Sequence, residues 1–301
     1  MEETALSSAG TKVDEEGTVG ARDRFVLILF AVCIVSVTVM YVLLYRETGT
    51  ALQSIIGLGL MLGLMVESRD SLNRPIHGYN NPVEEALIVA ALYFEWVLLF
   101  RFLLPFPEPY SDFFGGGLFG AVIPLYFLSR KCGYDLSLLG LSRKGARRSW
   151  RLTGTVCMSL TIAALLRLIL AASTPRAMTS ELLVAVLIMV PEVAILPGIT
   201  EEIVFRGVLQ PRLTYQLRSR VAGIVLTASI FAALHVFAVF WQAAAFPGDL
   251  LFSLLYALTT RLAIGGILSI VWDETGNLTQ PIVIHVTNNT LYVLLYAVGV
   301  V

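Results

Sequence analysis

The chain is poor in charged residues. Asp, Glu, Lys and Arg make up only 14% of its 301 residues, against about 25% in a typical soluble domain. Hydrophobic residues make up 56%. This balance argues against a soluble globular domain and predicts a polytopic membrane protein. The net charge of −1 indicates no particular class of binding partner.

Cysteine is also scarce. The three cysteines are Cys33, Cys132 and Cys157, and no two of them form a CxxC pair. This spacing argues against a disulfide framework and against a cysteine zinc site. The HExxH motif of zinc proteases is absent as well.

Long apolar runs divide the chain. They lie at about 25–45, 50–66, 83–104, 113–129, 152–172, 182–199, 221–241, 250–271 and 281–301. The first has the roughly 20 residues that a bilayer span needs, and it is too long for the core of a signal peptide. We therefore expect an all-α membrane helix bundle with eight or nine transmembrane helices and a polar active site inside. The expected divisions are a disordered polar tail (1–24), N-terminal transmembrane helices (25–130) and a core (131–301).

Positive charge predicts the orientation in the membrane. Lys and Arg concentrate in alternate connecting segments, at 1–24, 67–82, 130–151 and 201–220. The positive-inside rule then places the N-terminus and the polar residues near position 200 on the cytoplasmic side. We interpret the basic stretch as a topology signal, so the bilayer, and no nucleic acid, is the expected contact. The short loops suit a prokaryotic plasma membrane.

Several polar residues interrupt the apolar runs. They are Glu201, Glu202 and Arg206 at the end of the sixth run, His235 in the seventh, and His285 and Asn289 in the ninth. A charged side chain at the centre of a bilayer costs roughly 2.5–3.5 kcal/mol on insertion scales. Pro191 and Pro197 are expected to kink the helix that carries the glutamates, so that its end opens into a cavity.

Helical spacing relates these residues to one another. Side chains four residues apart share a helix face, which pairs Glu202 with Arg206, His235 with Phe231, and His285 with Asn289. Each pair alone has a structural explanation, as an ion pair at a helix end or as hydrogen bonds between helices. Their occurrence together favours one shared polar site.

The two adjacent carboxylates suggest a division of labour. Both cannot comfortably be ionised in a low-dielectric site without a compensating cation. Arg206 is placed to compensate Glu202. Glu201 then remains to hold a water molecule and to take its proton.

The remaining polar residues suit the other parts of a hydrolysis. His235 can share the water molecule with Glu201, and His285 and Asn289 can donate N–H groups to a developing oxyanion. Base, water and oxyanion donors together predict hydrolysis of an acyl bond.

Zinc is the competing reading of the same residues. Two histidines and one glutamate, here Glu201, His235 and His285, can hold zinc with an open fourth position. An adjacent Glu–Glu pair is an unusual ligand arrangement, and no short metal motif occurs. The expected mechanism therefore uses no cofactor.

Three motifs resemble a known family. EEIVFR matches EExxxR, FAALH matches FxxxH and HVTNN matches HxxxN of the CPBP family of intramembrane proteases, which includes the type II CAAX prenyl proteases. The resemblance covers about 200–290. It implies an all-helical membrane endopeptidase in which Glu201 activates water beside His235. It further implies His285 and Asn289 on the oxyanion side, with Glu202, Arg206 and Phe231 in support.

The resemblance leaves the substrate open. It implies a membrane protein or a lipidated peptide, without saying whether that substrate is prenylated. The alternative hypothesis is a non-enzymatic membrane scaffold, immunity factor or transporter that uses the polar core structurally.

Overall fold

The computed structural model is built of helices. It describes residues 20–46, 48–67, 79, 81–98, 116–135, 140, 146–170, 179–242 and 248–299. None of these residues lies in a strand. The all-α fold class predicted from the sequence is therefore confirmed for the described part of the chain.

The helices follow the apolar runs. They are α1 (Ala21–Tyr45), α2 (Thr48–Glu67), α4 (Pro82–Leu98), α5 (Ile123–Tyr126), α6 (Ala146–Leu170), α7 (Ser180–Met189), α8 (Leu196–Glu202), α9 (Gln210–Leu217), α10 (Arg220–Gln242), α11 (Leu250–Thr275) and α12 (Thr279–Ala297). Four π-helical segments join some of them, namely η3 (Leu118–Val122), η4 (Phe127–Lys131), η6 (Val190–Ile195) and η7 (Ile203–Leu209).

Six helical segments of the described residues are long and apolar enough to cross a membrane. They are Ala21–Tyr45, Thr48–Glu67, Trp150–Leu170, Ser180–Leu217, Arg220–Phe240 and Leu250–Thr275. The predicted count of eight or nine is not confirmed. The fourth predicted run lies partly outside the described residues, and α4 has only 17 residues. Helix α12 is not among the six, and a Gln, a His and two Asn lower its hydropathy.

The first two helices differ little from prediction. Helix α1 begins at Ala21, so the last four residues of the predicted disordered tail are helical. Residues 1–19 lie outside the described part. The short second run forms the complete helix Thr48–Glu67.

The sixth helix was predicted to end at the glutamates, and this was wrong. Helices α7, α8 and α9 and the π segments between them form one helical segment of 38 residues, Ser180–Leu217. About 20 residues suffice to cross the hydrocarbon core, so the segment extends well beyond one span. The glutamates therefore lie inside a helix rather than at its end. This position is stable because partners within the bundle compensate their charges.

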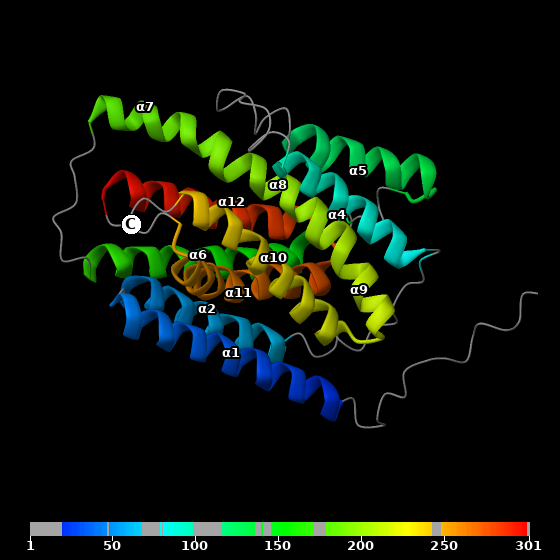
Figure 1. The fold of residues 1–301 in the computed structure, drawn as a ribbon, viewed down its shortest axis with the longest axis horizontal. Coiled ribbons are helices and arrows are strands. Elements are labelled where there is room, and N and C mark those ends of the chain that lie inside the picture. The colour runs from blue at the N-terminus through cyan, green and yellow to red at the C-terminus, as the bar shows by residue number, and fades with distance from the viewer. Residues whose placement is uncertain are drawn as a thin grey trace, which may run out of the picture.

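Helix α11 occupies the middle of the bundle. It packs against α1, α2, α10 and α12, and Figure 1 shows it behind the yellow helix α10, with the long α7–α9 segment crossing the bundle diagonally. Small residues allow this crowding, since a Cβ on Gly266 would lie 2.4 Å from the Met61 sulfur. Small residues at interfaces are typical of packed membrane helices.

The outer face of the bundle is apolar. Large side chains such as Leu43, Ile169 and Leu187 are at least 64% exposed. Contiguous apolar surface of this kind is unfavourable in water and suits contact with lipid. Together with the six spanning segments, it identifies an integral membrane protein.

A buried ion pair joins α4 to α9. Arg212 Nε donates to Glu85 Oε2 at 2.8 Å, and the Tyr134 hydroxyl donates to Glu85 Oε1 at 2.7 Å. The Arg212 guanidinium lies 4.7 Å from the ring centroid of Tyr79. Burial raises the pKa of the Tyr79 hydroxyl, which keeps the ring neutral beside the cation. These contacts give Glu85 a structural role.

We expect Arg212→Ala to destabilise the protein by about 3–5 kcal/mol, because it leaves the Glu85 carboxylate buried without its partner. Thermal unfolding in detergent measures this, with the exposed Arg151 changed to alanine as the matched control. Equal midpoints for the two variants would contradict the structural role of the pair.

Candidate active site

The Glu202 carboxylate is the centre of a buried polar network. Its side chain has no exposed surface. Arg206 Nη1 donates to Glu202 Oε1 at 2.8 Å, as the four-residue spacing predicts. His285 Nδ1 lies 2.7 Å from the same oxygen, and a carboxylate oxygen accepts, so Nδ1 carries the hydrogen. Glu202 therefore joins α8 to η7 and α12.

Arg206 is held on three sides. Besides the bond to Glu202, its Nη2 donates to the Gly265 carbonyl on α11 at 3.0 Å. The guanidinium carbon lies 4.7 Å from the ring centroid of Phe231 on α10, within the range of a cation–π contact. A charge that is fully buried is thus compensated by a carboxylate, a carbonyl and an aromatic face.

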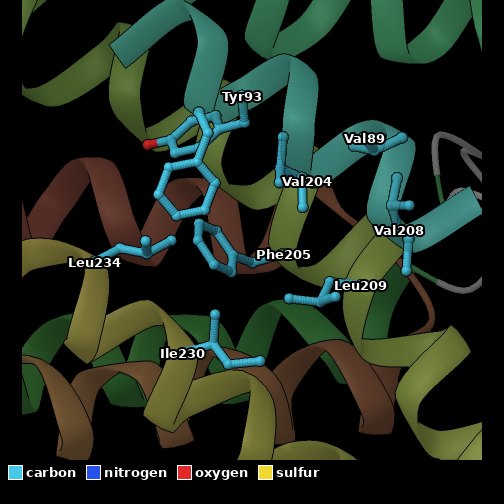
Figure 2. Close-up of a pocket in the computed structure, with 11 residues that line it drawn as sticks. Val89, Tyr93, Val204, Phe205, Val208, Leu209, Ile230 and Leu234 are labelled. Carbon is cyan, nitrogen blue, oxygen red and sulfur yellow. The ribbon is translucent and has the colours of Figure 1, made fainter. Parts of the chain in front are cut away.

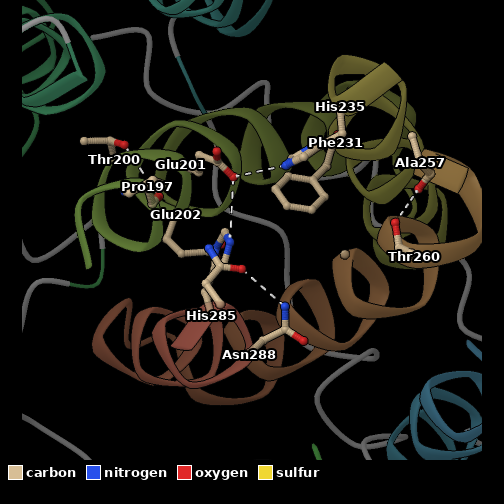
Figure 3. A network of polar contacts seen from close by, with 12 residues as sticks. Pro197, Thr200, Glu201, Glu202, Phe231, His235, Ala257, Thr260, His285 and Asn288 are labelled. Carbon is tan, nitrogen blue, oxygen red and sulfur yellow. Dashed lines mark hydrogen bonds and ion pairs between the residues drawn. The ribbon is translucent and has the colours of Figure 1, made fainter. Parts of the chain in front are cut away.

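Glu201 points to a different side of the helix from Glu202 (Figure 3), since successive residues are about 100° apart around a helix axis. The Tyr93 hydroxyl of α4 donates to its Oε1 at 3.3 Å. Its Oε2 faces two imidazoles, with His235 Nε2 at 3.9 Å and His285 Nε2 at 3.8 Å. These separations are too long for direct hydrogen bonds. They suit one water molecule shared by the three groups.

The partners of both histidines determine where the hydrogens lie. His235 Nδ1 lies 2.8 Å from the Phe231 carbonyl, which can only accept. Each imidazole therefore uses its Nδ1 hydrogen on a fixed acceptor and turns Nε2 toward Glu201. In the neutral form this Nε2 is an acceptor. The ring of Phe231 lies under His235, with 4.6 Å between centroids.

Asn289 contacts the backbone of η6. Its Nδ2 donates to the Val193 carbonyl in η6 at 3.2 Å. Pro197, four residues after Val193, has no N–H to give that carbonyl. Asn289 thus donates to a carbonyl that cannot receive an N–H from the residue four positions later. One of its amide hydrogens is used there, and the structure does not pair it with His285.

The helix that carries the glutamates is irregular on both sides of α8. The π segment η6, which contains Pro191, precedes α8, and η7 follows it directly. Such π turns occur often at functional sites. Pro191 thus lies in an irregular turn of the helix.

A glycine brings the two halves of the network together. A Cβ on Gly198 would lie 2.7 Å from Val286 Cγ2. Only a residue without a side chain lets α12 approach α8 this closely. The neighbour of Val286, His285, thereby reaches Glu202.

An apolar pocket of about 330 Å³, including its open part, lies beside the site. Its lining comes from α4, η7 and α10, and Figure 2 shows Tyr93 at the top, Ile230 at the bottom, and Phe205 and Leu234 between them. Tyr93 belongs to both features, because its ring lines the pocket and its hydroxyl contacts Glu201. The pocket therefore extends up to the candidate base.

Two residues near the site were not identified from the sequence. Tyr93 precedes the motifs by about a hundred positions, and nothing in its local sequence marks it. Arg261 on α11 has an electrostatic influence on Glu201 and His235. The signal that could have identified Arg261 is a lone cation inside an apolar run.

Glu201, His235 and His285 are the residues that would hold a metal ion. Within the described residues, no group of three or more His, Cys, Asp or Glu has the spacing for one. The separations of 3.8 and 3.9 Å exceed the roughly 3.4 Å between ligands in a tetrahedral site with bonds of 2.0–2.1 Å. The donor types fit zinc, and their positions here do not.

Comparison with known families finds a match over part of the chain. No curated protein and no solved structure matches the chain. Residues 180–291 match the family model described as type II CAAX prenyl endopeptidase Rce1-like. This segment contains Glu201, Glu202, Arg206, His235, His285 and Asn289, and it excludes Tyr93. Over residues 180–291 the chain is similar to this Rce1-like family, and that likeness suggests a protease.

Proposed function

We propose that the protein is an intramembrane endopeptidase that hydrolyses peptide bonds of membrane-associated proteins with water activated by Glu201. One observation carries this proposal. Glu201 Oε2 is buried, makes no direct hydrogen bond, and faces two imidazole nitrogens at distances that one water molecule bridges.

The reaction follows from this arrangement. Glu201 takes a proton from the water while the oxygen attacks the scissile carbonyl carbon. The carbonyl oxygen gains negative charge, and His285 in its protonated form donates Nε2–H to it, with Glu202 stabilising the imidazolium. Asn289 retains one amide hydrogen for the same oxygen. Glu201 then passes its proton to the leaving nitrogen as the C–N bond breaks.

The surroundings suggest the class of substrate. The apolar pocket lined by Tyr93 suits a hydrocarbon chain or a large apolar side chain next to the cleaved bond. We therefore propose a membrane-associated protein substrate, processed at a CAAX-type or related sequence. The basic connecting segments support a site toward the cytoplasmic side, and we propose that the membrane is a plasma membrane.

We expect Glu201→Gln to abolish cleavage, by at least about a thousandfold, and to leave the fold intact, because glutamine keeps the shape but cannot accept the proton. Comparing protein termini across the membrane proteome by mass spectrometry, with wild type and variant expressed at matched levels, measures this and identifies substrates. Glu95→Gln on α4, an exposed position, is the control. Identical termini for wild type and Glu201→Gln would favour a scaffold or transporter.

We propose that no metal ion takes part, because the protein groups around Glu201 suffice to bind and polarise water. Complete removal of metal by a chelator, verified by elemental analysis, should leave the cleavage rate unchanged. Loss of activity that zinc alone restores would instead assign Glu201, His235 and His285 as ligands.

Arg206→Ala should lower both stability and activity, because it leaves the buried Glu202 carboxylate with His285 as its remaining partner. We expect a loss of about 3–5 kcal/mol in unfolding free energy. Arg206→Lys keeps the charge but cannot donate to both Glu202 and the Gly265 carbonyl. The stability and activity of this variant should therefore lie between those of the wild type and of Arg206→Ala. Full stability of the alanine variant would contradict the assigned role of the pair.

A further inference from the structure

Tyr93 is the residue at which the apolar pocket meets the candidate base. Its hydroxyl donates to Glu201 Oε1 at 3.3 Å, and its ring lines the pocket. Among the described residues that line the pocket, Tyr93 alone has a polar side chain. The segment that matches the family model, 180–291, does not include it. Neither that match nor the sequence motifs therefore give Tyr93 a role.

The register of α4 determines where Tyr93 lies. Glu85, Val89 and Tyr93 follow one another at four-residue intervals, so they share one face of the helix, and all three are buried. The Glu85 carboxylate is bound to Arg212 on α9, and α4 packs against both α9 and η7. The face that carries Tyr93 is thus held against the helical segment that carries Glu201.

The two carboxylate oxygens of Glu201 have different surroundings. Oε1 accepts the hydrogen bond from Tyr93, whereas Oε2 has no direct hydrogen-bond partner and faces His235 and His285. The last side-chain torsion of a glutamate is broad, so the carboxylate turns easily. The Tyr93 hydroxyl therefore determines which oxygen is directed toward the imidazoles.

A row of aromatic rings leads from Tyr93 to the other side of the site. The rings of Tyr93 and Phe205 lie 5.9 Å apart between centroids, and those of Phe205 and Phe231 lie 5.2 Å apart. Phe231 in turn contacts His235. Both Tyr93 and Phe205 line the pocket (Figure 2). An apolar group in the pocket would thus pack directly against the ring that holds the base.

The contact between Tyr93 and Glu201 has room to tighten. A hydroxyl donor normally lies about 2.5–3.0 Å from its acceptor, and the distance here is 3.3 Å. The pocket leaves part of the Tyr93 ring without protein neighbours, so the ring lacks dispersion contacts on that side. A group that packs there would restrict the ring and favour the shorter hydrogen bond.

We propose that Tyr93 is a positioning residue, which couples occupation of the pocket by an apolar group of the substrate to the orientation of Glu201. This inference rests on the proposed protease function. Binding energy from a part of the substrate that does not react can be used to orient the groups that do. The apolar group should therefore raise kcat as well as lower KM.

The test uses two quenched fluorescent peptides with one CAAX-type sequence. The cysteine of one carries a dodecyl thioether and that of the other a methyl thioether. The full chain in detergent should cleave the dodecyl peptide with a kcat about ten- to a hundredfold higher, the range for a hydrogen bond to a charged group. Tyr93→Phe should abolish this difference in kcat. It should preserve the difference in KM, because phenylalanine still lines the pocket.

Tyr45→Phe is the matched control. The Tyr45 hydroxyl also donates to a carboxylate, that of Asp249, at 3.4 Å, and it belongs to a separate aromatic cluster with Tyr41 and Phe252. This variant should leave both ratios as they are in the wild type.

Two kinetic results would overturn the inference. One is a kcat for the dodecyl peptide that Tyr93→Phe leaves unchanged. The other is an equal loss of kcat on both peptides at an unchanged unfolding midpoint, which would mean that Tyr93 orients Glu201 whether or not the pocket is filled.

Infrared difference spectroscopy separates this inference from the proposed function, because it needs no turnover. The carboxyl band of Glu201 is the one that Glu201→Gln removes, and the probe is S-dodecyl-N-acetylcysteinamide, with the S-methyl compound as its control. If only the dodecyl compound shifts the band, and only when Tyr93 is present, the coupling stands even where neither peptide is cleaved. If the band responds equally in the wild type and in Tyr93→Phe, the coupling is wrong whatever the protein hydrolyses.

Discussion

The buried polar network depends on the carboxylate of Glu202, which has no exposed surface. A buried charge without partners is strongly destabilising, so its position constrains every group around it. Arg206 and His285 both donate to one of its oxygens. Arg206 in turn contacts Gly265 and Phe231. One side chain thus fixes the relative positions of helices α8, α10, α11 and α12, and the candidate active site is built on that frame.

Adjacent carboxylates can take different roles because a helix turns by about 100° per residue. Glu202 faces the Arg206 guanidinium and the His285 imidazole, which both donate to it. Glu201 faces the Tyr93 hydroxyl and two Nε2 atoms that are acceptors when neutral. Different surroundings for neighbouring titratable groups are how proteins separate a base from a supporting residue.

Contacts within one helix could be predicted from the sequence, and contacts between helices could not. The pairing of Glu202 with Arg206 and the contact of the His235 and Phe231 rings both follow from a four-residue spacing. The contact between His285 and Glu202 joins positions 83 residues apart. No periodicity encodes it, so the motifs identified the residues but not the partner of each nitrogen.

The error about the helix end has a physical cause. A run of apolar residues was taken to stop where Glu201 and Glu202 begin, because charges leave the hydrocarbon core of a bilayer. Inside a bundle the same charges find partners, and the backbone continues as a helix to Leu217. Hydropathy describes a helix that faces lipid, so it misjudges one whose polar side faces other helices.

Two glycines show that the polar site depends on backbone packing as much as on its charged groups. Gly198 lets α12 approach until Val286 would touch any side chain placed there. Gly265 both admits the ring of Phe231 and offers its carbonyl to Arg206. A methyl group at Gly265 would displace that ring, and the His235 ring would shift with it, because the two rings are in contact. The distance between His235 and Glu201, on which sharing a water molecule depends, is therefore set by a residue that has no side chain.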